Sequence, residues 1–149
     1  MSDTESVTHW RCLERMFAGA AINAEFTPAL VVDDGTATVR QTIRDAQHHA
    51  GHAAHGAVLF KMLDDAAYFA AASTVREVFL VTVSFNTVFL RPVAEGEITA
   101  TGVLVHRSRN LLVAEAALRD ARDRLIATAT GTFQRSAMPL DAAVGYSQV

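Results

Sequence analysis

The stretch that decides the fold is AVLFKMLDDAAYFAAAS, residues 57–73. It is rich in alanine, leucine and methionine, which are strong helix formers, and it carries charge only at Lys61, Asp64 and Asp65. A helix that is apolar on nearly every side belongs in a protein interior. The stretch therefore predicts one long buried helix.

The residues that follow this helix have the pattern of a β-sheet. In residues 78–90 apolar side chains occupy most odd positions, whereas Thr82, Ser84 and Asn86 occupy even ones, which is typical of a strand with one buried face. Short connectors lead to the next strands and favour antiparallel neighbours. Further strands are expected at residues 97–106, 111–118 and 125–133.

The sequence before the helix predicts smaller elements. Residues 10–22 have apolar side chains at helical spacing and indicate a short amphipathic helix. Residues 28–32 are expected to be extended. A turn signal at residues 33–35 precedes a predicted strand at residues 36–43.

One buried helix followed by an antiparallel meander indicates an α+β fold, with the sheet wrapped around the helix. The chain has 149 residues, 50% of them hydrophobic, which suits a single domain over residues 1–149. Residues 1–9 are polar and residues 136–149 show no clear period, so both segments are expected to be peripheral or flexible. Such a sheet leaves an edge strand and part of one face uncovered, so we expect dimerisation.

Charge and cysteine content exclude several classes of function. The formal net charge is −3 and no segment is dominated by lysine and arginine, which argues against nucleic acid or a membrane as a partner. Cys12 is the single cysteine, so no intrachain disulfide forms and nothing indicates an oxidising compartment. Residues 1–8 lack the apolar core of a signal peptide, and the longest apolar run, residues 66–72, is too short to span a bilayer. We therefore expect a cytoplasmic protein.

Asp64 is the most unusual residue of the predicted helix. At helical spacing its neighbours include Phe60, Ala67 and Tyr68, so it lies on an apolar face. Burial of an ionised carboxylate is costly without a partner and raises its pKa, as an acid/base catalyst or a nucleophile requires. The alternative is a structural aspartate bonded to Tyr68 or to a backbone amide. The helix pattern leaves both interpretations open.

Asp65 receives a different interpretation. It lies four residues after Lys61, and this spacing indicates an ion pair on a solvated helix face. Such a pair contributes little to stability, in particular because lysine precedes aspartate. We therefore leave Asp65 out of the predicted site.

The start of the helix offers a second candidate for chemistry. His55 and Gly56 lie where the helix begins, and free N–H groups at the positive end of the helix dipole can polarise a carbonyl or hold an oxyanion. Gly56 has no side chain, so a ligand can approach its backbone closely. The alternative is that Gly56 only permits a sharp turn and that His55 caps the helix.

The spacing of the two candidates bears on quaternary structure. Gly56 and Asp64 are eight residues apart, which is about 12 Å along a helix axis. A donor and a carboxylate must each lie roughly 3 Å from the reacting atoms, so the two residues of one chain cannot readily serve the same substrate group. Two antiparallel copies of the helix would bring Gly56 of one subunit to Asp64 of the other. If both residues act, the site therefore straddles a dimer interface.

Three ordered blocks of the sequence carry a resemblance to a known family. Residues 55–64, HGAVLFKMLD, are similar to the signature of hotdog-fold thioesterases, in particular their phenylacetate-pathway (PaaI-like) branch: His-Gly-Gly, six further residues, then Asp or Glu. Residues 82–92 resemble the next strand of this family, and residues 127–133 resemble its last strand. The resemblance covers roughly residues 35–135 and implies a hotdog fold that hydrolyses acyl-CoA thioesters.

The resemblance implies roles at the matching positions. Asp64 would be the general base that activates water, or the nucleophile that attacks the thioester. Gly56 would donate its backbone N–H to the thioester oxygen, and Thr82 would help to hold the attacking water or Asp64. Family members often carry Asn or Gln six residues before the motif histidine; here that position is His49, which can still donate a hydrogen bond. Ala57 replaces the second glycine of the motif.

The same resemblance suggests where the substrate lies. The acyl group is expected between the buried helix and the partner subunit. Arg107 and Arg109 lie in the turn where the family usually has a glycine next to a basic residue; they suit the CoA phosphates, or are simply exposed turn residues. The residues expected to contact the substrate are His55, Phe60, Leu63, Tyr68, Asn86, Arg107 and Arg109.

Residues 45–56 form a histidine-rich loop that contains His48, His49, His52 and His55. Imidazole is a common zinc ligand, but no Cys or Glu joins these histidines and the loop gives them no common face. We therefore predict no metal site and expect His48 and His52 near the mouth of the pocket.

The predicted function is hydrolysis of an acyl-CoA to a free acid and CoA by a homodimer or homotetramer, with CoA as part of the substrate and no cofactor. One alternative is a non-catalytic acyl-CoA binding or sensing protein on the same fold. A second is a hotdog enoyl-CoA hydratase or dehydratase, whose different arrangement of His and acid is not found here. The sequence identifies neither the acyl group nor the tetramer geometry.

Overall fold

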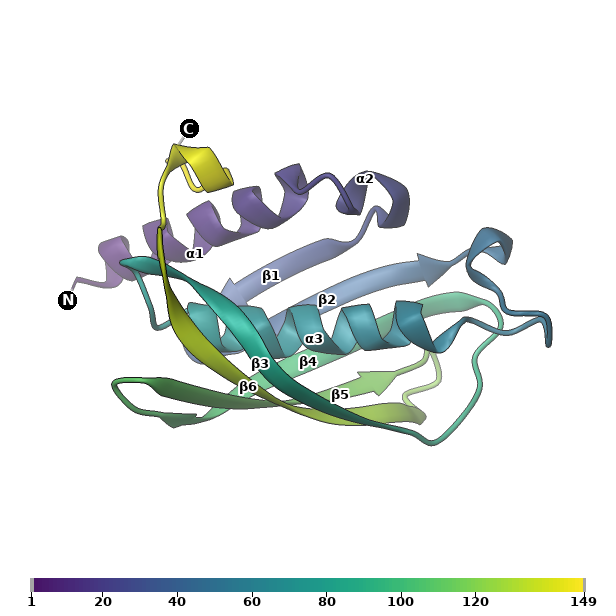
Figure 1. Cartoon of the computed structure of the whole chain (residues 1–149). Coiled ribbons are helices and arrows are strands. Elements are labelled where there is room, and N and C mark those ends of the chain that lie inside the picture. Colours follow the sequence, from purple (N-terminus) through teal and green to yellow (C-terminus); the bar gives the residue numbers. More distant parts are fainter. Residues whose placement is uncertain (1, 149) are drawn as a thin grey trace.

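The structure is a computed structural model that describes residues 2–148. A single antiparallel sheet curls around the central helix α3, and a second long helix, α1, lies beside it (Figure 1). The helices are α1 (Asp3–Gly19), α2 (Asn23–Phe26) and α3 (Gly56–Ala72), with short 3-10 helices η1 (Asp45–Gln47) and η2 (Ala142–Val144). The sheet has the order β1-β2-β4-β5-β6-β3 and is formed by β1 (Ala29–Asp33), β2 (Thr36–Ile43), β3 (Val78–Phe89), β4 (Gly96–Arg107), β5 (Leu111–Arg119) and β6 (Leu125–Pro139). None of the helices within residues 2–148 is long and apolar enough to cross a bilayer.

The centre of the core is α3. Leu63, Ala66 and Ala67 have no solvent-exposed surface, as expected for a helix that is apolar on nearly every side. At Gly102 the sheet lies so close to the helix that a Cβ atom would collide with the carbonyl oxygen of Ala66, so only glycine fits there. The predicted α+β architecture, an antiparallel sheet around one long buried helix, is confirmed.

In strand β3, the side chains that face the helix do not all stand at even positions or all at odd positions. Its pairing with β6 shifts register between Thr82 and Ser84, as at a β-bulge. Leu80 and Thr82 face α3 before the shift, and Phe85 and Phe89 face it afterwards. The prediction that the odd positions form one apolar face is therefore wrong, because the bulge moves the inward set from even to odd positions.

The N-terminal helix is longer than its apolar pattern indicates. It begins at Asp3, after a capping box in which the Ser2 hydroxyl accepts from the Glu5 amide and the Glu5 carboxylate accepts from the Ser2 amide. The segment expected to be peripheral or flexible is thus helical from Asp3, and His9 is only 2% exposed. Polar side chains fill the first turns, so the sequence shows this part of the helix only through its cap. Residue 1 lies outside the described residues.

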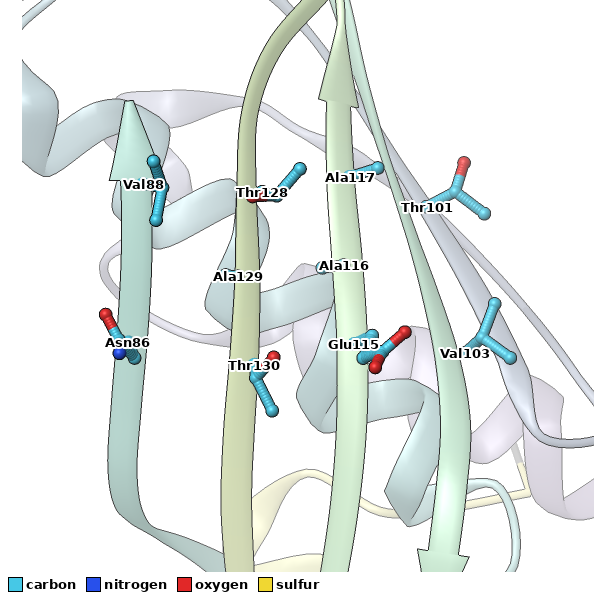
Figure 2. Close-up of a pocket in the computed structure, with 10 residues that line it drawn as sticks. All are labelled: Asn86, Val88, Thr101, Val103, Glu115, Ala116, Ala117, Thr128, Ala129 and Thr130. Carbon is cyan, nitrogen blue, oxygen red and sulfur yellow. The ribbon is translucent and has the colours of Figure 1, made fainter. Parts of the chain in front are cut away.

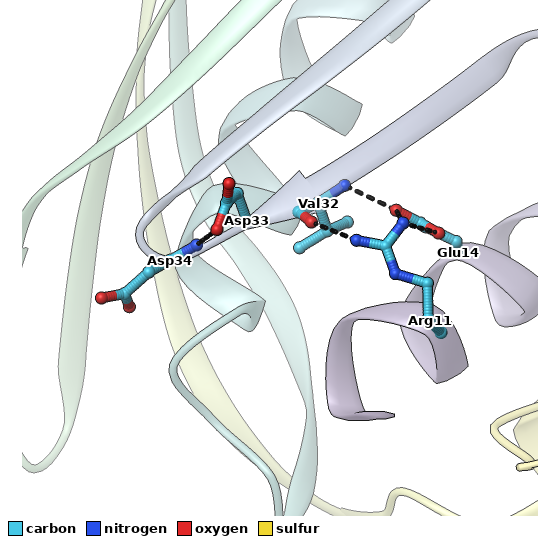
Figure 3. Close-up of polar contacts among 5 residues, drawn as sticks. All are labelled: Arg11, Glu14, Val32, Asp33 and Asp34. Atoms are coloured by element: carbon cyan, nitrogen blue, oxygen red, sulfur yellow. Dashed lines mark hydrogen bonds and ion pairs between the residues drawn. The ribbon is translucent and has the colours of Figure 1, made fainter. Parts of the chain in front are cut away.

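Helix α1 covers one edge of the sheet. The amide of Val32 on β1 donates to Glu14 at 2.8 Å, and the carbonyl of Val32 accepts from Arg11 at 3.0 Å. Arg11 and Glu14 pair at 2.7 Å, and in the following turn the Asp33 carboxylate accepts from the amide of Asp34 (Figure 3). An edge strand normally leaves such backbone groups open to another chain. Helix α1 therefore supplies hydrogen-bond partners for the backbone N–H and carbonyl of Val32 on the edge strand β1.

The C-terminal segment packs against α1, and His9 of α1 contacts both this segment and the end of α3 (Figure 1). His9 Nε2 lies 2.9 Å from the carbonyl oxygen of Ala72, and His9 Nδ1 lies 2.7 Å from the Tyr146 hydroxyl. Burial lowers the pKa of His9 and favours the neutral ring; because a carbonyl only accepts, Nε2 carries the proton and Tyr146 donates to Nδ1. The C-terminal segment, expected to be peripheral or flexible, thus lies on the outside of the fold and contacts α1 through Tyr146; residue 149 lies outside the described residues.

The opposite edge of the sheet is open. No segment within residues 2–148 pairs with the outer side of β3. The strand also presents Val81 and Val83 to solvent, 43% and 57% exposed. An exposed apolar edge strand is a template for pairing with another chain.

Candidate active site

Asp64 lies half-buried in the middle of α3 and faces β3. The hydroxyl of Thr82 donates to its Oδ1 at 3.3 Å, and Oδ2 has no hydrogen-bond partner among the described residues. Burial raises the pKa of Asp64; the hydrogen bond from Thr82 and the charge of Lys61 offset this only in part. The carboxylate is therefore a stronger base than an exposed aspartate.

The structural interpretation of Asp64 required Tyr68 or a backbone amide as its partner. Tyr68 instead donates to the carbonyl of Leu80 at 2.9 Å and accepts from the amide of Leu80 at 3.1 Å. Burial raises the pKa of Tyr68, which keeps the phenol protonated. No backbone amide within residues 2–148 donates to Asp64. A single hydrogen bond of 3.3 Å is weak, so Asp64 contributes little to the stability of the fold.

A cleft of about 610 Å³ opens beside Asp64. Thr82 and Tyr68 line it with Asp64, and further walls come from the segment between the end of α1 and the start of α2, within residues 16–23, and from residues 143–145. Its volume lies in the range of small-molecule sites. No motif in the terminal segments links them to α3, so the sequence did not indicate these walls.

The Lys61–Asp65 pair is not solvated, contrary to the interpretation of its spacing. Lys61 Nζ and Asp65 Oδ2 are 2.6 Å apart, and the side chains are 13% and 20% exposed. Because α2 folds over this side of α3, Asn23 accepts a second hydrogen bond from Lys61 at 2.7 Å. Burial raises the pKa of Asp65 to about 6, although the charge of Lys61 opposes the rise. Both residues line the cleft beside Asp64.

Phe60 and Leu63, two of the predicted contact residues on α3, lie away from this cleft. Leu63 has no exposed surface and belongs to the core. Phe60 packs edge-to-face on Phe85, with 5.0 Å between ring centroids. Of the seven residues expected to contact the substrate, only Tyr68 lines this cleft.

The start of α3 presents one unpaired backbone donor. His55 Nδ1 accepts from the amide of Ala57 at 2.9 Å, and the His55 carbonyl accepts from the amides of Val58 and Leu59. The Gly56 N–H has no partner among the residues that the structure describes. The cap formed by His55 therefore leaves Gly56 as a free donor at the positive end of the helix dipole.

His49 and Gly56 line a second cleft, of about 340 Å³, together with Phe89. The amide of Gly51 donates to Nδ1 of His49 at 2.9 Å, so a neutral His49 carries its proton on Nε2. The loop is held in place by a hydrogen bond from the His49 amide to the carbonyl of Ala53 at 2.9 Å. His49 can therefore offer an N–H donor close to that of Gly56.

The two halves of the predicted site lie in different clefts of one chain. Asp64 and Thr82 line the cleft between α1, α3 and β3, whereas Gly56 and His49 line the cleft at the start of α3. Asp64 thus lies with Thr82, and Gly56 lies with His49. Within one chain, however, these two pairs are apart. Residues of β3, the open edge strand, line both clefts.

Asn86 lies on the opposite face of the sheet. Its side chain lines a groove of about 470 Å³ with Thr130, Glu115 and Val103, and Figure 2 shows the sheet between these side chains and the helix. The register shift after Thr82 determines this orientation. Asn86 therefore does not meet the other predicted site residues of its chain.

Arg107 and Arg109 lie at the turn between β4 and β5, where Arg135 joins them around a surface pocket. Arg135 donates to the carbonyls of Ser108 and Arg109 at 3.0 and 2.6 Å, which fixes the turn. The arginines concentrate positive charge at this end of the sheet.

Two of the loop histidines hold the loop itself. His48 Nε2 lies 2.6 Å from the carbonyl oxygen of Ala94, and His55 caps α3. Within residues 2–148 no group of three or more His, Cys, Asp or Glu side chains is placed to hold a metal ion.

Residues 51–127, more than half of the chain, match the model of the thioesterase superfamily. The chain belongs to this superfamily. Membership supports thioester hydrolysis as its class of reaction. No curated protein matches the chain.

Several solved structures have the same fold as this chain. The PaaI protein from the phenylacetic acid degradation operon of E. coli matches with a TM-score of 0.80 and 23% identity over 90% of this chain and 97% of that one. A conserved protein from Pseudomonas aeruginosa matches with a TM-score of 0.74 and 29% identity over 78% and 94%. A thioesterase from Haemophilus influenzae matches with a TM-score of 0.73 and 16% identity over 80% and 85%. The predicted hotdog fold and thioesterase resemblance are confirmed.

Proposed function

We propose that the protein is an acyl-CoA thioesterase that releases a free carboxylic acid and CoA, with Asp64 as its general base. The observation that carries this proposal is the environment of Asp64. Its carboxylate has a raised pKa and lies beside a ligand-sized cleft in a member of the thioesterase superfamily. A group with these properties suits proton abstraction from water.

In the proposed reaction, Asp64 takes a proton from a water molecule as the water oxygen attacks the thioester carbonyl carbon. The Thr82 hydroxyl occupies Oδ1, so Oδ2 is the oxygen available to the water. The carbonyl oxygen becomes an oxyanion; when it re-forms the double bond, the C–S bond breaks. The sulfur of CoA leaves with the electron pair and takes up the proton that Asp64 accepted.

The oxyanion requires donors that the Asp64 cleft does not contain. Gly56 has an unpaired N–H, and His49 offers Nε2–H, but both line the cleft at the start of α3. We therefore assign these donors to the second subunit of a dimer. The free N–H lies at the helix N-terminus, where the dipole also favours the developing negative charge.

The open edge of β3 supports such a dimer. Antiparallel pairing of two copies of β3 would satisfy its free backbone groups and cover Val81 and Val83. A two-fold axis at this edge also sets the two α3 helices antiparallel, so that the Gly56 end of one approaches the middle of the other. Arg107 and Arg109 are assigned to the CoA phosphates, since arginine binds phosphate oxygens in a bidentate manner.

A hybrid dimer tests the proposal. Asp64→Asn removes the base, and Gly56→Pro removes the donor N–H while suiting the first position of a helix. The residue before it is already in an extended conformation, as proline requires, with ψ 140° at His55. Each variant alone is expected to release thiol from acyl-CoA at least about 10²-fold more slowly than the wild type.

The two variants are then co-expressed with different tags and purified through both tags. One of the two sites in such a hybrid is intact if each site straddles the subunits, so about half of wild-type turnover is expected. A hybrid without activity would contradict the shared site. Tight acyl-CoA binding without thiol release by the wild type would favour a sensor, and hydration of an enoyl-CoA would favour a hydratase.

A further inference from the structure

The cleft beside Asp64 contains a second carboxylate that the proposed reaction does not use. Asp65 lies on the same helix, and its Oδ2 is paired with Lys61 at 2.6 Å. Lys61 is held in turn by Asn23 and by the faces of Phe17 and Phe26, at 5.3 and 5.1 Å from the ring centroids. The pair is therefore fixed in place and largely removed from solvent.

One oxygen of Asp65 remains available. An ionised carboxylate can accept several hydrogen bonds, but Oδ1 of Asp65 has no partner among the described residues. A partly desolvated acceptor in a cleft favours a ligand that brings its own donor, because an unmatched buried polar group is costly. Asp65 is thus a recognition group within the cleft.

The charge in the cleft limits which ligand fits. The positive charge of Lys61 is neutralised by Asp65, and Asp64 adds one further negative charge. An anionic acyl tail would meet net repulsion in a poorly solvated site. The remaining walls include Phe17, Phe79 and Val144, which suit an apolar tail.

We infer that the acyl group of the substrate is apolar and carries a neutral hydroxyl, which donates to Oδ1 of Asp65. This inference rests on the proposed thioesterase function, whose acyl chain would enter the cleft beside Asp64. Asn23 and Phe17 lie outside residues 51–127, the part that matches the superfamily. Asp65 and Lys61 lie within that part, so the common core supplies the acceptor and the N-terminal segments hold its partner Lys61 in place.

The substrate preference is tested with a six-carbon series: hexanoyl-CoA, hexanoyl-CoA with a single hydroxyl at each of carbons 3 to 6, and adipoyl-CoA with its terminal carboxylate. At the best position, the hydroxyl is expected to raise kcat/KM about tenfold over hexanoyl-CoA, as a hydrogen bond to a charged group would. Adipoyl-CoA is expected to be the poorest substrate of the series. Equal kcat/KM for hydroxylated and unsubstituted substrates would overturn the inference.

The role of the pair is tested with the double variant Lys61→Met/Asp65→Leu. Apolar residues of similar volume often replace a buried ion pair without loss of stability. The ratio of kcat/KM for hydroxylated and unsubstituted hexanoyl-CoA is expected to fall to about one, because the acceptor is gone. A merely structural role would change both substrates alike and leave the ratio unchanged, which would overturn the inference.

Asp65→Asn is the second variant. It keeps the shape of the side chain and a weaker, neutral acceptor, so an intermediate ratio is expected. Asp123→Asn, at an exposed turn with positive φ, makes the same chemical change far from the cleft and should keep the wild-type ratio. Failure to hydrolyse any member of the series would contradict the thioesterase function itself; hydrolysis without a hydroxyl preference would contradict only this inference.

Discussion

Thr82 and Asp64 meet across the gap between β3 and α3, with 3.3 Å between the hydroxyl oxygen and Oδ1. The contact exists because Thr82 precedes the register shift of β3; beyond the shift, an even-numbered residue such as Asn86 faces away from the helix. The hydrogen bond acts against burial and lowers the pKa of Asp64. Thr82 is therefore a positioning residue that also adjusts the basicity of Asp64.

Thr82→Val tests this role, because valine keeps the shape of the side chain and removes the hydroxyl. Without the hydrogen bond the pKa of Asp64 should rise further, and the acid limb of kcat/KM against pH should move to higher pH. Thr82→Ser keeps the donor and is the matched control, with a limb near that of the wild type. An unchanged limb in Thr82→Val would show that the contact does not influence the base.

Asp64→Asn should lower kcat by about 10²- to 10⁴-fold, the usual contribution of a general base. In the wild type, activity should be lost as pH falls through the raised pKa of Asp64, because only the ionised form accepts a proton. The acid limb of the pH–activity profile should therefore lie at a pH above the ordinary pKa of aspartate. Thiol release across a pH series measures both effects. The inactive variant should keep the wild-type melting temperature within a few degrees, and full activity would remove Asp64 from the mechanism.

Gly56→Pro and Gly56→Ala separate the backbone donor from the space above it. Alanine keeps the N–H, and its Cβ would lie 3.4 Å from the Phe89 ring, a contact that a small shift of the ring relieves. Proline removes the N–H, so kcat should fall by about 10²- to 10³-fold, as with other oxyanion donors. Gly56→Ala should retain most activity. Similar turnover in the two variants would mean that the N–H does not bind the oxyanion.

Asp65 should make the stability of the fold pH-dependent. Its pKa is raised from 3.8 to about 6 in the folded state, so between these values the folded protein holds a proton that the unfolded chain releases. The free energy of unfolding should then fall as pH rises through this window, by on the order of 2–3 kcal/mol from this group. Urea unfolding of the wild type and Asp65→Asn at about pH 4 and about pH 7 isolates this contribution. A difference between the two proteins that stays constant with pH would contradict it.

The sequence by itself determined the parts of the structure that depend on local periodicity. Residues 57–73 predict α3 because an all-round apolar helix must be buried, and residues 36–43 coincide with β2. The motif at residues 55–64 placed Gly56 and Asp64 on that helix, eight residues apart. The rise of a helix then implies that these two residues are too far apart to act on one substrate group within a chain. In the structure they indeed lie in different clefts.

Only the tertiary structure decided which side chains share a surface. The bulge after Thr82 reverses the faces of β3, and no local pattern marks it, because it arises from pairing with β6. The Lys61–Asp65 spacing looks like a surface pair until α2 folds over it and Asn23 binds Lys61. The cleft beside Asp64 likewise needs residues from both ends of the chain, which only packing brings together.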